Sequence, residues 1–218
     1  MATTYLNLVN DVLVRLREST VASVTENDYS SLIGKLVNDA KREVEDAWNW
    51  ECLRTTVTVS TSSGTSGYTL TGSGDRFRVQ EVYDDTSDQY LESKPTAFFT
   101  DALSLTASPK SGNPYYYNIN GVNSSGDILV RLFPVPDNTY SIKFAGFTPE
   151  AELSSGSDTT KLPKQAIEAL AWAKAIEERG EDGGVNVSSQ YAVAKQALAD
   201  AIAIEAGRRD DEITWYWA

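Results

Sequence analysis

Hydrophobic residues recur at helical spacing in the first fifty residues. Between residues 5 and 17 they return every three or four positions, which predicts an amphipathic helix. A second helix is predicted over residues 27–49, with Thr25 as its N-cap and Asp28 three residues further on. The sequence therefore predicts an N-terminal helical hairpin over residues 1–52. The apolar positions of the two helices are Leu6, Val9, Leu13 and Leu16, then Ile33, Leu36, Val37, Ala40, Val44 and Trp48.

The period changes from helical to alternating between residues 53 and 150. Segments such as TTVTV, DILVRLF and YSIKFAGF are rich in β-branched and aromatic residues, and clusters of Gly, Ser, Asn and Asp separate them. Short strands with turns between them are typical of an antiparallel sandwich or a barrel-like domain. The stretch PTAFFTDAL predicts a short helix or turn that interrupts the strands.

Helical spacing returns over residues 151–207, after the polar linker ELSSGSD. Pro163 is suited to the first turn of a third helix, which we expect to end at Gly180. A fourth helix is predicted from Ser188 or Ser189 to Ala206, with Gly207 after it. This last helix is rich in Ala, which allows close helix packing either inside one subunit or between subunits.

These elements predict an α+β fold. Two N-terminal and two C-terminal helices would form a four-helix bundle. An antiparallel β-sandwich or barrel-like domain would be inserted at 53–150, and residues 208–218 would form an extended C-terminal tail.

Charge and composition narrow the range of functions. The chain has 19 Lys and Arg against 31 Asp and Glu, for a net charge of −12, which argues against a protein that grips nucleic acid. It has no His and a single Cys, Cys52, so His-based catalysis, thiolate zinc sites and an internal disulfide are excluded. We expect Cys52 to pack rather than react. No phosphate-binding loop is present, and we predict no enzymatic activity, no cofactor and no metal site. The N-terminus does not show the long apolar run that a signal peptide or a membrane span would need.

The chain ends in RRDDEITWYWA, a charged stretch followed by aromatic residues. Aromatic side chains dominate binding hot spots because they bury a large area with few rotatable bonds. The tail could therefore anchor in a crevice of a partner. Alternatively, Trp215 and Trp217 could fold back over the core of this protein, or the tail could be disordered. The candidate anchoring residues are Arg208, Arg209, Ile213, Trp215, Tyr216 and Trp217.

Four stretches resemble the head-to-tail adaptor, or connector, proteins of tailed bacteriophages, including those described as tail tubular protein A or gatekeeper-like. They are TYLNLVNDVLVRLRE, AKREVEDAWNWECLR, the segment from SGNPYYYNIN through LFPVPDN to TPEAEL, and KLPKQAIEALAWAKAIEE. None of them is a catalytic motif. Their order along nearly the whole chain carries the resemblance.

The resemblance implies a structural virion protein of the phage neck, made in the host cytoplasm. It would form a homo-oligomeric ring, usually of twelve subunits, between the portal and the tail nozzle or tube. DNA would pass through the bore without specific binding, and the aromatic tail would wedge against the portal. Another neck protein, for head completion or tail termination, remains an alternative. A glycan-binding module built on PYYYN and a hydrolase using two carboxylates are more distant alternatives.

Overall fold

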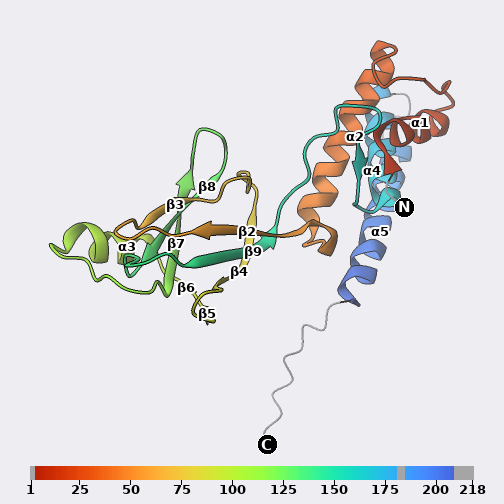
Figure 1. The fold of residues 1–218 in the computed structure, drawn as a ribbon. Helices are drawn as coiled ribbons and strands as arrows, with labels where there is room; N and C mark the ends of the chain where they lie inside the picture. Colours follow the sequence, from red (N-terminus) through yellow and green to blue (C-terminus); the bar gives the residue numbers. More distant parts are fainter. Residues whose placement is uncertain (1–2, 181–184, 209–218) are drawn as a thin grey trace, which may run out of the picture. The chain divides into compact units, whose positions relative to one another are not determined.

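The computed structural model describes residues 3–180 and 185–208, and the chain divides into two compact units (Figure 1). The helical unit comprises Met1–Cys52 and Glu150–Ala218, and the β unit comprises Leu53–Pro149. The helical unit contains α1 (Tyr5–Arg15), α2 (Asp28–Ala47), α4 (Lys164–Arg179) and α5 (Val185–Ala206). It also contains a two-stranded sheet of β1 (Thr3–Thr4) and β10 (Thr159–Thr160).

Helix α4 is the centre of the helical unit, because it packs against α1, α2 and α5. Its apolar positions are nearly continuous, with Ile167, Ala171 and Ala173 fully buried. Pro163 is the N-cap of this helix rather than a residue of its first turn, and the helix ends before Gly180, whose φ of 63° is the left-handed conformation that favours glycine. The α4 sequence therefore specifies both the ends of the helix and its burial.

Helix α2 begins at a different cap from the one predicted. Asn27, not Thr25, is the N-cap: its side chain accepts a hydrogen bond from the Ser30 N–H at 2.8 Å. The Ser30 hydroxyl accepts one in return from the Asn27 N–H at 3.2 Å, which completes a capping box. An Asn with Ser three residues later satisfies two helix-terminal donors, and so the helix starts at Asp28.

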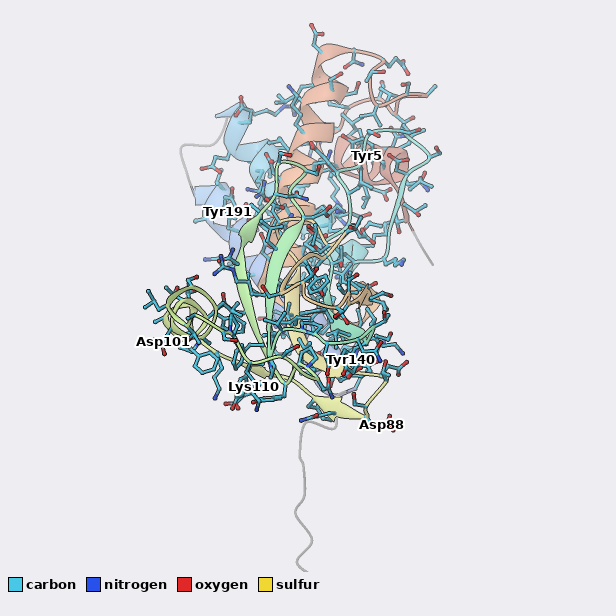
Figure 2. The ribbon with its side chains drawn as sticks, turned by 60° about the vertical axis from the view of Figure 1, so that its left-hand side comes forward. Tyr5, Asp88, Asp101, Lys110, Tyr140 and Tyr191 are labelled. Atoms are coloured by element: carbon cyan, nitrogen blue, oxygen red, sulfur yellow. The ribbon has the colours of Figure 1, made fainter. Side chains whose placement is uncertain are left out.

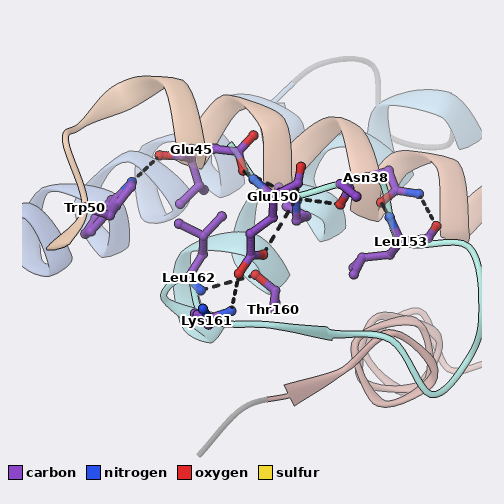
Figure 3. Close-up of polar contacts among 11 residues, drawn as sticks. Asn38, Glu45, Trp50, Glu150, Leu153, Thr160, Lys161 and Leu162 are labelled. Carbon is purple, nitrogen blue, oxygen red and sulfur yellow. Dashed lines mark hydrogen bonds and ion pairs between the residues drawn. The ribbon is translucent and has the colours of Figure 1, made fainter. Parts of the chain in front are cut away.

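The segment that follows the β unit is fixed along α2 (Figure 3). Glu45 accepts the N–H of Glu150 at 2.7 Å, and Asn38 makes two hydrogen bonds with the backbone of Leu153. The buried ammonium of Lys41 lies 3.4 Å from the carboxylate of Glu45 and donates to two backbone carbonyls. Polar side chains of α2 therefore take the place of a sheet partner for this returning segment.

The β unit contains two four-stranded sheets. One sheet has the order β2-β9-β4-β5 and the other β3-β8-β7-β6. A short helix, α3 (Thr96–Phe99), and a π-helix, η2 (Thr100–Leu105), follow β6; a 3-10 helix, η1 (Glu51–Leu53), precedes β2. The strands are β2 (Arg54–Ser60), β3 (Gly67–Thr69), β4 (Arg78–Asp84), β5 (Gln89–Tyr90), β6 (Glu92–Ser93), β7 (Tyr116–Val122), β8 (Ile128–Phe133) and β9 (Ser141–Phe147).

The two sheets of the β unit share one apolar core. Alternate residues of β8 are buried, among them Val130 and Leu132, as expected for a strand with one face inward, and Phe144 of β9 joins the same core. Gly146 in β9 allows β4 to approach, because a Cβ at this position would lie 2.2 Å from the Arg78 carbonyl oxygen. The core thus forms where strand alternation predicts it.

The class α+β fits the structure, but the predicted architecture is wrong. The described residues contain five helices and three sheets, rather than four helices and one antiparallel domain. Helix α3 is the fifth helix and lies in PTAFFTDAL, where a short helix or turn is predicted; β1 and β10 form the additional sheet, and β6 pairs with β7 in parallel. The strands β1, β6 and β10 are two residues long and depend on partners distant in sequence, and so periodicity does not reveal them. Of the predicted extended tail, only Arg208 belongs to the described residues.

Candidate interaction site

The root of the C-terminal tail is fixed by a buried carboxylate. Glu205, at the end of α5, is 7% exposed and accepts the N–H of Glu51 at 2.8 Å. Its other oxygen lies 3.1 Å from the guanidinium of Arg208. Arg208 is therefore held against the turn that follows α2. The other predicted anchoring residues lie outside the described residues: Arg209, Ile213, Trp215, Tyr216 and Trp217.

A groove of about 660 Å³ lies between α2 and α5, over α4. Its walls and floor are mainly apolar, and charged side chains stand at its rim. An apolar groove with a polar rim is the usual form of a peptide-binding site. The lining residues include Val44 and Ala47 of α2, Leu170 of α4, and Tyr191, Ala194 and Leu198 of α5.

A second groove, of about 290 Å³, is lined by the next residues of the same elements. Trp50 and Cys52 follow α2, Pro163 precedes α4, and Ala201 and Ile204 continue α5. The α5 residues of both grooves recur every three or four positions from Tyr191 to Arg208, so they share one helix face. We call the two grooves together the trough.

Cys52 does not pack in the core as predicted, because it is exposed at the trough. Partial burial, together with the negative charges of Glu150 and Glu205, raises the pKa of its thiol. The thiol is therefore a weak nucleophile at neutral pH but is reachable from solvent.

The face of α5 that points away from the trough is exposed and nearly uncharged. Val193 on this face is 55% exposed, and among residues 187–206 only Ala194 and Glu205 are buried. A helix that is apolar all round is normally covered on all sides. This surface, the outward face of α5, comprises Ala192, Val193, Gln196, Ala199, Asp200 and Ala203.

Polar contacts at the trough rim connect α5 and α2 to α4. The phenol of Tyr191, labelled in Figure 2, donates to Glu177 at 2.5 Å. Lys174 lies 2.5 Å from the carboxylate of Glu43. Burial, the hydrogen bond to Glu177 and the charges of Glu177 and Glu43 raise the pKa of Tyr191 to about 12.

Two carboxylates do meet between α1 and α4, as a hydrolase would require. Burial and a hydrogen bond with Asp11 raise the pKa of Glu168. The pKa of Asp11 is lowered: burial alone would raise it, but hydrogen bonds with Lys164 and Glu168 outweigh that effect. Lys164 lies 2.8 Å from Asp11 and 3.1 Å from Glu168, and Arg15 lies 3.2 Å from Glu168. Both carboxylates are thus engaged by cations, and neither lines the trough.

The half-buried tyrosines of PYYYN pack against other aromatic side chains of the β unit. Tyr116 meets Phe98 edge to face at 5.3 Å between ring centroids, and Tyr117 meets Phe144 at 5.9 Å. Tyr115 meets Tyr116 edge to face at 4.5 Å between ring centroids. Packing between strands and α3 therefore accounts for these aromatic residues without a glycan.

Sequence reasoning missed Glu205, Trp50 and Tyr191 as parts of the site. The spacing of Glu205 and Arg208 indicates an ion pair on one turn of helix, and this signal was available. No local signal places Trp50 beside α5, because the two segments are about 150 residues apart in the sequence.

Residues 3–180 and 185–208 hold no group of three or more potential metal ligands. Within the same residues, no helix combines the length and the apolar character needed to cross a membrane.

Comparison with known proteins gives one family. A family model described as SU10 adaptor protein matches residues 3–216, which is nearly the whole chain. A search of curated proteins finds no match.

Proposed function

The chain belongs to the SU10 adaptor protein family, and from this premise we propose that it is a head-to-tail adaptor that joins the portal of a phage to its tail nozzle or tube. Family membership makes it an adaptor-type structural protein of the virion. The match over residues 3–216 carries this proposal, because it covers both units rather than one common module.

The proposed adaptor works as a ring of identical subunits, twelve in the form that the sequence resemblance implies. A closed ring needs two different surfaces on each subunit that meet head to tail. Subunits with a net charge of −12 repel one another, so contact is least costly where charge is sparse. The outward face of α5 meets this condition, since Lys195, Asp200 and Glu205 are the charged residues of the whole helix. We assign this face to the neighbouring copy.

The proposed portal anchor is the C-terminal tail. Arg208 and Arg209 begin a charged stem, and the apolar side chains that would enter the portal crevice are Ile213, Trp215, Tyr216 and Trp217. The Glu205–Arg208 pair supports this role, because it holds the last described residue before the tail against the end of α5. A fixed root lowers the conformational entropy lost when the tail docks.

In this proposal DNA passes through the bore of the ring without specific binding. The chain has 31 acidic and 19 basic residues. This excess of acidic residues supports passage of DNA, because acidic walls repel a polyanion rather than hold it.

A portal pull-down tests the proposed function. Three forms are compared: the full chain, a chain that ends at Gly207, and a full-length variant with Ile213, Trp215, Tyr216 and Trp217 all replaced by Ser. The full chain should bind the cognate portal. Both altered forms should keep their circular dichroism spectrum and lose portal binding. Equal binding by all three forms would refute the tail as the anchor, and no binding by the full chain would refute the adaptor proposal.

A further inference from the structure

The trough begins beside Arg208, which is the last described residue of the chain. The lining residues of α2 and the turn after it run in the same direction as those of α5. Residues 43–47 line the first groove together with residues 191–198, and residues 50–52 line the second together with residues 201–208. Residues of α4 and its approach follow in the opposite order, with Pro163 in the second groove and Leu170 in the first. The trough therefore runs along α5 from Arg208 to Tyr191.

The ten residues after Arg208 are long enough to fill the trough. Leu198 lies ten helical residues before Arg208, which is about 15 Å along α5. Trp215 is seven residues beyond Arg208, and an extended segment of that length spans about 23 Å. Because the span exceeds the distance, a tail that turns back at Arg208 brings its aromatic residues over the first groove.

The apolar floor of the trough matches the aromatic part of the tail, and two lysines in its lining can meet tail carboxylates, beside four acidic residues that also line it: Glu43, Asp46, Glu51 and Glu205. The floor offers apolar side chains such as Ala194 and Leu198, which suit tryptophan rings. Lys161 lines the second groove and Lys195 the first, and both are exposed. Among the described residues neither lysine has a carboxylate within ion-pair distance. The tail supplies three carboxylates, on Asp210, Asp211 and Glu212.

We propose that residues 209–218 of the free subunit fold back into the trough of their own chain, with Ile213, Trp215 and Trp217 over the apolar floor. The fold-back itself does not depend on the proposed function. Its consequence rests on that function, because a tail that anchors in the portal must first leave the trough. Its apparent affinity for the portal is then reduced by the fraction of subunits in which the tail is released. The aromatic segment is also kept from contacts with other proteins before assembly.

Cys52 reports on this state without an introduced label site, because it is the single cysteine and lines the trough. The rate of Cys52 alkylation by iodoacetamide is measured at one alkaline pH, without portal, for the full chain and the chain that ends at Gly207. We expect severalfold slower alkylation in the full chain. The matched control is the full-length Ser variant of Ile213, Trp215, Tyr216 and Trp217, which keeps every charge and should react as fast as the truncated chain.

Three results would overturn the proposal. One is the same alkylation rate in all three proteins. Another is slow Cys52 alkylation in the Ser variant as well, since the charged stem alone would then explain the protection of the thiol. The third is protection that disappears on dilution, because the tail would then occupy the trough of a second copy. The portal pull-down is a separate readout, so loss of portal binding alone leaves the fold-back intact.

Discussion

Helices α4 and α5 are equally rich in alanine but have opposite surroundings. Alanine makes up about a third of each, whereas charged residues number six of sixteen in α4 and three of twenty-two in α5. Eight of the sixteen residues of α4 are buried among α1, α2 and α5. In α5, Ala194 and Glu205 are the buried positions within residues 187–206. The difference shows that α4 completes the core of one subunit, whereas α5 presents a surface suited to further contacts.

The same substitution in both helices should give the largest contrast. Ala171→Glu places a charge at a fully buried position of α4, and the desolvation of that charge costs several kcal/mol, on the order of the whole stability of a domain. Ala199→Glu places the same charge on the outward face of α5, where helix propensity barely changes. Thermal unfolding followed by circular dichroism should show an unfolded or severely destabilised Ala171→Glu protein and an Ala199→Glu protein close to the parent. Similar destabilisation by both would mean that the outward face of α5 is part of the subunit core.

A smaller loss of stability is expected when the hydrogen bond between Tyr191 of α5 and Glu177 of α4 is removed. Tyr191→Phe removes the hydrogen bond to Glu177 at the exposed trough rim and should cost about 0.5 kcal/mol. Because the pKa of Tyr191 is raised from 10.0 to about 12, this contribution is complete below pH 10 and is lost as the pH rises through about 12. The difference in tyrosinate absorbance between the parent and the variant should therefore titrate near pH 12. A difference that titrates near pH 10 would contradict the interaction with Glu177.

Sequence patterns predict where the helices lie better than they predict what packs against each helix. Helix α5 ends at Ala206 before Gly207, as predicted, because glycine is a clear stop signal. Which side of α5 is covered could not be predicted, since an Ala-rich helix has no polar face to mark. The same limit applies to the first cap of α2, where Thr25 and Asn27 both fit by residue type. Only the geometry selects Asn27.

The candidate site was predictable only in part. Arg208 was singled out from the charged stretch, and the structure gives it a partner in Glu205. The aromatic residues of the tail lie outside the described residues, and their role remains a prediction. The trough could not have been predicted, because its walls come from segments far apart in the sequence and its existence depends on how α5 packs on α4.

Electron microscopy of adaptor bound to portal tests most directly whether the outward face of α5 joins neighbouring subunits. The test variant carries Ala199→Glu and Ala203→Glu, and the control carries Ala107→Glu and Ser108→Glu, the same two added charges on an exposed segment of the β unit. The parent and the control should form closed rings on the portal, whereas the α5 variant should keep its fold and attach without closing a ring. Closed rings of the α5 variant, indistinguishable from those of the parent, would contradict the assignment of this face to the neighbouring subunit.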